Sequence, residues 1–394
     1  MKNTFKKITA LTFSILTVGA LTSCNKDKPV EKRTVKIAVS YNSPMLQKAA
    51  ESYSNTHDDS CIELVEYGLS GDEHAERTAD DLKLEIASGA IPDIIDVSLI
   101  SGLELEKFGM YTDLYPFLDS DKELSREDFF PNVFTACEDE GRLLSLPVTY
   151  KTIFISVGKT KFFGDFTELT DEYIMELAEK YPDKQLHAIH TNSSDYIFDV
   201  FDMNRFISYD SYTCNFNSEE FIDILEFCKQ YPAEGEWMFE QDENILTERA
   251  LISSFPVSMY TTLDSFDKMF GDEEYTVLET EFDYGIRFAI TENCPDKNDA
   301  WDFIRELYNA DTGDEFPVTI KQFEEKEESF VTSEQYNFAY SVLSEADGYT
   351  ENLNHDISVI IKEETVECFG GAITSQECAE NIQNRVSVYL SEHS

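Results

Sequence analysis

The sequence predicts an α/β fold of two lobes joined by a hinge, and two observations support this prediction. First, segments with strand-like and helix-like patterns alternate along the first hundred residues, and such an order is typical of a parallel sheet covered by helices. Second, the chain has 394 residues, of which 42% are hydrophobic. It is therefore long enough for more than one hydrophobic core.

The first strand and the first helix are marked by local patterns. Apolar residues at alternate positions, Val35, Ile37 and Val39, predict a strand with one buried face. The next segment begins with Ser43 and Pro44. Serine is a favoured N-cap residue, and proline is favoured at the first helical position, so a helix is expected to begin there.

Two more strands and a second helix complete the β-α-β-α-β order. The strands are expected at 62–67 and 94–97, and the helix between them should end at Gly89. In parallel sheets ligands bind beyond the carboxyl ends of the strands. We therefore expect the loops 41–43, 69–71 and 98–99 to lie on one rim of the sheet.

The rest of the chain alternates between strands and helices in the same way. Strands are expected at 143–147 and 152–157. An Asn217/Ser218 cap precedes one amphipathic helix, and Thr374 with Glu377 forms a capping box before the last helix.

The N-terminus predicts export and a lipid anchor. Lysines precede an apolar run over residues 8–21 that is too short to span a bilayer, as in a secretory signal. The run ends in Leu-Thr-Ser-Cys, which resembles the lipobox of bacterial lipoproteins. This resemblance implies a signal peptide over 1–23, lipid attachment at Cys24, a tether over 24–33 and a position on the extracytoplasmic face of the membrane.

The composition narrows the classes of ligand. The formal net charge of −47 disfavours nucleic acid and anionic lipid, and it favours neutral or cationic ligands. Apart from Cys24, seven cysteines are scattered along the chain without a C-x-x-C pair, a pattern that indicates neither a disulfide framework nor a zinc site. We expect neither cofactor nor metal.

Five segments, in this order along the chain, resemble the family 1 extracellular solute-binding proteins, the lipid-anchored receptors of carbohydrate ABC importers. The first resembles the family's L-x-x-x-x-A-G-x-x-P-D passage from helix to strand. The segments are LEIASGAIPDI at 84–94, GMYTDL at 109–114, GRLLSLP at 141–147, FNSEEF at 216–221 and KNDAWDFI at 297–304.

The resemblance implies a periplasmic-binding-protein fold (type II), in which a solute binds in a cleft between two lobes. The chain would cross the hinge near 147–152 and again near 283–285. Residues 34–148 plus 284–320 would form the first lobe, and 149–283 plus 321–394 the second. The protein would deliver a sugar or oligosaccharide to the permease subunits of an ABC transporter, without chemistry on the solute.

Binding a neutral sugar requires aromatic faces against its C–H surface and polar groups for its hydroxyls. Seven residues have suitable chemistry, and all but Trp237 lie near expected strand ends or the hinge. The predicted ligand-binding residues are Tyr41, Asn42, Asp96, Ser98, Tyr150, Trp237 and Tyr260.

Two other functions remain open. An exported hydrolase could use two of the 78 acidic residues, because that chemistry depends on a separation in space. The same receptor fold could instead bind a cationic solute, in keeping with the negative charge. His187-x-x-His190 lacks the glutamate of a zinc protease helix, and Asp119-x-Asp121-x-Glu123 lacks the turn glycine of an EF-hand.

Overall fold

The computed structural model describes most of the chain after its N-terminal segment. The described residues are 32–68, 75–100, 109–135, 137–163, 168–187, 192–209, 211–232, 250–257, 274–345, 348–349 and 353–392. The predicted signal peptide, Cys24 and nearly all of the tether lie outside them, as do Trp237 and Tyr260. Among the described helices none combines the length and apolar character needed to cross a bilayer.

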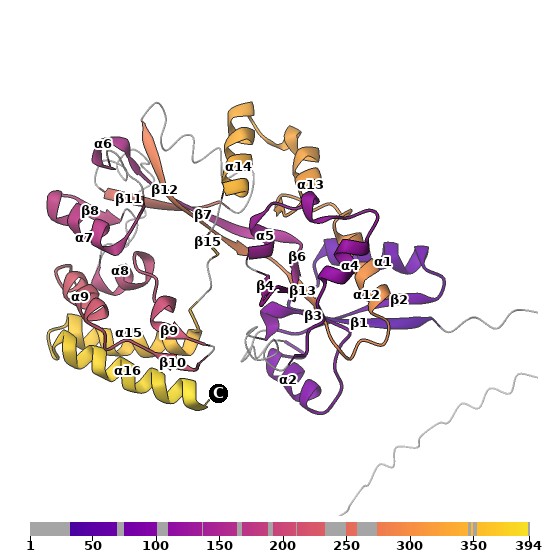
Figure 1. Ribbon diagram of the computed structural model, residues 1–394, viewed down its shortest axis with the longest axis horizontal. Coiled ribbons are helices and arrows are strands. Elements are labelled where there is room, and N and C mark those ends of the chain that lie inside the picture. Colours follow the sequence, from indigo (N-terminus) through magenta and orange to yellow (C-terminus); the bar gives the residue numbers. More distant parts are fainter. Residues whose placement is uncertain are drawn as a thin grey trace, which may run out of the picture.

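The predicted α/β, two-lobe fold is confirmed (Figure 1). The first lobe, lobe 1, contains a five-stranded sheet of order β2-β1-β3-β13-β6. Its strands are β1 (Arg33–Val39), β2 (Ser60–Glu66), β3 (Ile94–Asp96), β6 (Leu146–Pro147) and β13 (Arg287–Ile290). β1 begins at the outer end of lobe 1 and runs toward the other lobe, so its carboxyl end faces the space between them (Figure 1).

The predicted parallel arrangement holds for the first three strands, since β1 pairs in parallel with both β2 and β3. The late strand β13 pairs antiparallel with β3 and β6, which makes the sheet mixed. Ser43 caps helix α1 (Pro44–Thr56) as expected. Helix α2 (Ala79–Ala87) begins after a capping box between Thr78 and Asp81.

The second sheet has the order β15-β12-β7-β11-β8, with β14 pairing β7 off this path. Its strands are β7 (Thr149–Lys159), β8 (Gln185–His187), β11 (Ala250–Val257), β12 (Tyr275–Tyr284), β14 (Phe316–Pro317) and β15 (Gly348–Tyr349). The long antiparallel pair of β7 and β12 runs across the top of the view between the two lobes (Figure 1). Two short pairs join β4 (Glu138–Asp139) to β5 (Arg142–Leu143) and β9 (Ile207–Ser208) to β10 (Thr213–Cys214).

The remaining helices pack around the sheets or on one another, as α15 and α16 do (Figure 1). They are α4 (Tyr115–Ser120), α5 (Asn132–Thr135), α6 (Thr160–Phe163), α7 (Asp171–Lys180), α8 (Ser193–Asp199), α9 (Glu219–Cys228), α12 (Lys297–Leu307), α13 (Ile320–Glu325), α14 (Ser333–Glu345), α15 (His355–Phe369) and α16 (Ser375–Glu392). The predicted caps are present, because Ser218 caps α9 and Thr374 exchanges hydrogen bonds with Glu377 at the start of α16.

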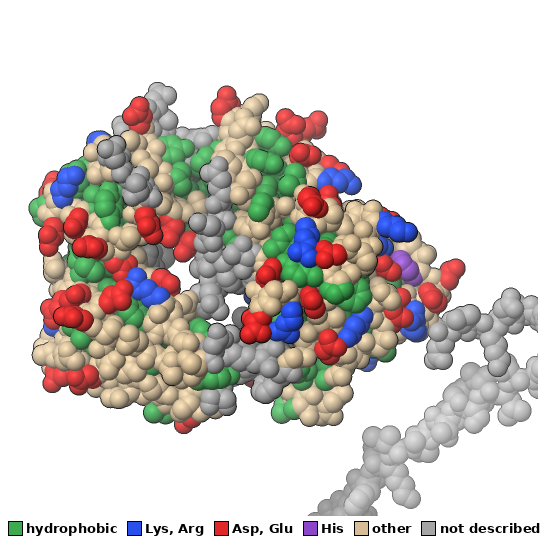
Figure 2. Space-filling model, in the orientation of Figure 1, with side chains coloured by type: hydrophobic (Ala, Val, Ile, Leu, Met, Phe, Trp, Pro, Cys, Tyr) green, Lys and Arg blue, Asp and Glu red, His purple; other side chains and the backbone are tan. Residues whose placement is uncertain are grey.

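Two large hydrophobic clusters hold the fold together. The first joins the lobe 1 sheet, α12 and α14 to the faces of β7 and β12 that carry Ile153 and Phe282. The second joins α7, α8, α9, α15 and α16, and it forms the core of lobe 2. Acidic side chains are spread over the surface of the face drawn in Figure 2, between patches of hydrophobic side chains.

Candidate functional site

A buried carboxylate joins two strand ends of the lobe 1 sheet. Asp96, at the end of β3, is 0% exposed. Its Oδ2 accepts hydrogen bonds from the backbone N–H of Ser40 at 3.1 Å and from the Ser40 hydroxyl, while its Oδ1 accepts from Ser98 N at 3.1 Å and Ser98 Oγ at 2.8 Å. These bonds compensate the cost of burying a charge, and they fix the end of β1 beside the end of β3.

The residues that follow these strand ends form a polar and aromatic rim. Tyr41 is 60% exposed, an unusual position for a large aromatic ring, and Ser98 is exposed as well. The side-chain oxygen of Asn42 is buried and meets no hydrogen-bond donor among the described residues. The backbone N–H of Asn42 donates to Glu66 Oε2 at 3.3 Å. An exposed ring and an acceptor that lacks a donor therefore lie side by side in the sequence at the edge that faces lobe 2.

The structure separates the predicted site residues into three groups. Tyr41, Asn42, Asp96 and Ser98 lie together on this rim, and all of the Asp96 hydrogen bonds described above are made within the protein. Tyr150 lies elsewhere, in the hydrophobic interior at the start of β7. The remaining two, Trp237 and Tyr260, lie outside the described residues, so their roles stay predictions.

Tyr150 is enclosed in the protein interior. It is 1% exposed, and its hydroxyl donates to Asn132 Oδ1 at 2.6 Å. Burial raises the pKa of this hydroxyl, an effect that the hydrogen bond to Asn132 only partly offsets. A solute would reach the ring only after a rearrangement that exposes it.

The predicted hinge crossings lie next to each other. Tyr284 pairs with Tyr150, and the backbone N–H of Gly285 donates to Thr149 O at 2.9 Å. Lys151 follows Tyr150 and is 66% exposed in its side chain, and its Nζ lies 3.2 Å from Asp283 Oδ2. We did not select this ion pair from the sequence; the alternation of side chains along a strand could have indicated that Lys151 faces away from the interior.

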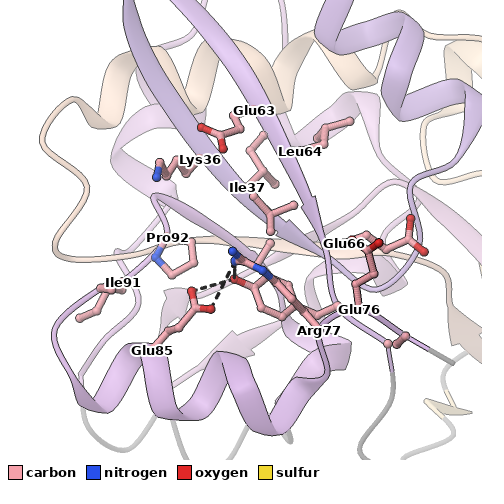
Figure 3. A pocket seen from close by; sticks show the side chains of 16 residues that line it. Lys36, Ile37, Glu63, Leu64, Glu66, Glu76, Arg77, Glu85, Ile91 and Pro92 are labelled. Atoms are coloured by element: carbon pink, nitrogen blue, oxygen red, sulfur yellow. Dashed lines mark hydrogen bonds and ion pairs between the residues drawn. The ribbon is translucent and has the colours of Figure 1, made fainter. Parts of the chain in front are cut away.

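A hollow of about 760 Å³ lies between α2 and the edge strand β2 (Figure 3). Its polar lining includes Lys36, Glu63, Glu66 and Arg77. Arg77 Nη1 donates to Glu85 Oε1 and to the Tyr67 hydroxyl, each at 3.3 Å. None of the predicted ligand-binding residues that the structure describes lines this hollow.

The two other motifs weighed in the sequence have structural partners. His187 is 3% exposed, and its Nε2 lies 3.2 Å from Ser254 Oγ; His190 lies outside the described residues. Asp121 accepts from Trp301 Nε1 at 2.7 Å and from Arg305 Nη1 at 3.0 Å. In the described part of the chain, no group of three or more His, Cys, Asp or Glu side chains is arranged to hold a metal ion.

Sequence comparisons find no match among protein-family models or curated proteins. Solved structures match over nearly the whole chain. A family 1 extracellular solute-binding protein from Alicyclobacillus acidocaldarius has a TM-score of 0.56 at 12% identity and covers 93% of this chain and 100% of its own. The sugar-binding protein MalE from Xanthomonas citri has a TM-score of 0.56 at 12% identity, with 91% and 98% covered.

A third structure, the putative binding protein MsmE from Bacillus subtilis in an open conformation, has a TM-score of 0.57 at 12% identity, with 92% of this chain and 98% of that chain covered. At such low identity the likeness establishes the fold. The chain therefore has the two-lobe fold found in family 1 extracellular solute-binding proteins.

Proposed function

We propose that this protein is a receptor that captures a neutral sugar or oligosaccharide between its lobes. The observation that carries the proposal is the lobe 1 rim, where the ring of Tyr41 is 60% exposed beside Asn42, whose side-chain oxygen is buried without a donor among the described residues. The Asn42 side chain would have to turn outward to present this oxygen to a sugar hydroxyl. An aromatic face can stack on the C–H surface of a sugar ring, and sugar hydroxyls can donate to an amide oxygen. The rim has both groups at the edge where α/β sheets bind ligands.

The structural neighbours support this proposal by their named functions. The Xanthomonas citri protein is a sugar-binding protein, and a Listeria monocytogenes substrate-binding protein with a TM-score of 0.50 is described in complex with cycloalternan. These are binding proteins rather than enzymes. Capture and release without chemistry on the solute is accordingly the activity that we propose here.

The remaining parts of the proposal come from the sequence. Cys24 would carry the lipid that holds the protein on the extracytoplasmic face of the membrane, and an ABC permease would receive the solute. Residues 34–148 plus 284–320 would move as one lobe against 149–283 plus 321–394. The packing of α13 and α14 on the first hydrophobic cluster favours a change to these bounds, with residues 321–345 moving with lobe 1 instead of lobe 2.

A panel of neutral oligosaccharides tests the proposal. Binding to the folded state alone must raise the melting temperature, and Tyr41→Ala should reduce that rise. Leu84→Ala is a matched control, because Leu84 is 70% exposed on the same lobe but lies on α2, away from the rim. Failure of every sugar to bind would contradict the proposal, as would release of hydrolysis products, which would favour the hydrolase alternative.

A cationic solute is the second candidate. The net charge of −47 favours it, as do the carboxylates of Glu63, Glu66, Glu76 and Glu85 around the hollow in Figure 3. Stronger binding of a polyamine than of every sugar in the panel would decide for this candidate.

A further inference from the structure

One buried asparagine connects three segments that are distant in the sequence. The side-chain oxygen of Asn132, in α5, accepts from the Tyr150 hydroxyl at 2.6 Å, and its Nδ2 donates to Leu343 O at 3.0 Å. Its main-chain carbonyl accepts from the Tyr284 hydroxyl at 3.2 Å. The three partners belong to β7, α14 and β12. We name the cluster of Asn132, Tyr150 and Tyr284 the hinge clasp.

The hinge clasp is closed to water. Asn132 is 5% exposed, Tyr150 1% and Tyr284 3%. The two tyrosine rings stack with centroids 5.4 Å apart and an interplanar angle of 30°. A buried polar group that loses its partner cannot bond to water instead, so each of these hydrogen bonds is costly to break.

The clasp lies where β7 begins and β12 ends. Tyr150 and Tyr284 pack in the first hydrophobic cluster, which also includes Ile153, Ile155 and Val157 of β7, whereas Leu278, nearer the start of β12, packs in the second. Next to the clasp the pairing is irregular: Asp283 pairs with Thr152, and Tyr284 pairs with Tyr150, so Lys151 is skipped. An extra residue of this kind lets a strand bend locally.

We propose that Asn132 is the positioning residue of the hinge: it holds β7, β12 and α14 in one arrangement, so that the lobes turn beyond it, at the irregularity beside Lys151. While the clasp is intact, the two walls of the solute site are already held in position for binding. Without the clasp, part of the binding free energy is spent on ordering the hinge, so the affinity for the solute falls. The expected effect of the clasp on solute affinity rests on the proposed function, whereas its expected effect on the hinge does not.

The test measures the distance between the lobes in the absence of any solute. Spin labels are placed at Leu84 on α2 and Val388 on α16, which are 70% and 56% exposed. The half-buried Cys61 and Cys214 are replaced by serine to prevent labelling there. Tyr150→Phe and Tyr284→Phe each remove one hydroxyl of the clasp, and Asn132→Leu removes its centre.

Tyr53→Phe is the matched control. Tyr53 is fully buried in lobe 1, and its hydroxyl lies 3.2 Å from Ser60 Oγ, away from the hinge. The control variant should lower the melting temperature without changing the distance distribution. The clasp variants should broaden the distribution and weaken solute binding about fivefold or more. Tyr150→Phe should add little to Asn132→Leu, because both remove the same contact.

Distance distributions that match the wild type in both phenylalanine variants would overturn the proposal and leave these bonds with a role in stability only. These two variants decide the matter even if Asn132→Leu does not fold. If no solute binds the wild type, the proposed function fails, whereas the distributions of the solute-free protein still test the clasp.

Discussion

Two tyrosine–asparagine pairs in this protein have similar chemistry and opposite surroundings. Tyr41 and Asn42, on the lobe 1 rim, combine a ring that is 60% exposed with an amide oxygen that has no donor among the described residues. Tyr150 and Asn132, in the hinge clasp, are nearly inaccessible and bonded to each other at 2.6 Å. Exposure distinguishes the Tyr41 ring, which a solute can meet, from the Tyr150 ring, which is packed inside the protein. The two asparagines differ in their partners, because the side-chain oxygen of Asn132 has a donor and that of Asn42 has none among the described residues.

The sequence predicted a ligand contact for both tyrosines, because both lie close to expected strand ends. They differ in where they lie: Tyr41 follows the end of β1 in a loop, whereas Tyr150 lies within β7 and is covered by other rings. Tyr150 lies under the aromatic rings of Phe282 and Tyr284, which come from a strand more than a hundred residues away. Four substitutions, taken in decreasing order of their expected effect on stability, test the roles given to the rim, the core and the β7/β12 pair.

Asp96→Ala should have the largest effect on stability. It leaves the donors of Ser40 and Ser98 without their acceptor and frees the ends of β1 and β3 from each other. We expect a loss of about 3 kcal/mol in the free energy of unfolding, measured by urea denaturation. A loss below about 1 kcal/mol, within the range of ordinary surface changes, would show that Asp96 does not hold the rim.

Asp121→Asn should cost about 2 kcal/mol near neutral pH, because it removes the charge that Trp301 and Arg305 surround. Burial by itself raises the pKa of Asp121, but the hydrogen bonds from Glu123, Trp301 and Arg305 outweigh it and lower the pKa below the usual 3.8.

Because the pKa of Asp121 is lower in the folded protein than in the unfolded chain, its charged carboxylate stabilises the folded state at pH values above the usual pKa of 3.8. This stabilisation is lost as the pH falls through the lower pKa of the folded protein. The difference in stability between wild type and Asp121→Asn should therefore narrow between pH 6 and pH 3. A constant difference over this range would contradict the role assigned to the charge. Asp119→Asn, in an exposed pair with Arg126, should show a much smaller effect at every pH.

Gly285→Ala should lower the free energy of unfolding of the protein by about 1–2 kcal/mol, as urea denaturation can measure. A Cβ at this position would lie 2.6 Å from Thr149 Oγ1, which donates to Glu315 Oε2 at 2.7 Å. Thr149→Ala removes the atom in conflict, so the double variant should recover part of the loss caused by the glycine change alone. Equal free energies of unfolding for wild type and Gly285→Ala would show that the backbone around Gly285 or the Thr149 side chain can move to accommodate a Cβ.

Tyr41→Ala should change stability least, by no more than about 0.5 kcal/mol, since its ring is mostly in solvent. It should nevertheless weaken sugar binding by about 1–3 kcal/mol through lost stacking, as titration calorimetry can measure. Unchanged affinity would remove Tyr41 from the site while leaving the fold intact.

Local signals in the sequence predicted the helix starts well, but the strand expected at 143–147 is divided between β5 and β6, and β7 already begins at Thr149. Ser43, Ser218 and Thr374 cap the helices where expected, because a cap depends on residues only a few positions away. The insertion of β13 beside β3 was not predicted, since it joins segments about two hundred residues apart. Asn132 was missed for the same reason: nothing near it in the sequence indicates its partners in β7, β12 and α14.

Hydroxyl-radical footprinting of Tyr41 and Tyr150, with and without a bound sugar, tests whether the first meets a solute and the second only stabilises the protein. We expect Tyr41 to be oxidised in the free protein and protected when the sugar binds, whereas Tyr150 should remain unmodified in both states. Mass spectrometry of the peptides measures both residues in one sample. Oxidation of Tyr41 that a bound sugar leaves unchanged, with new protection or exposure at Tyr150 instead, would contradict the account.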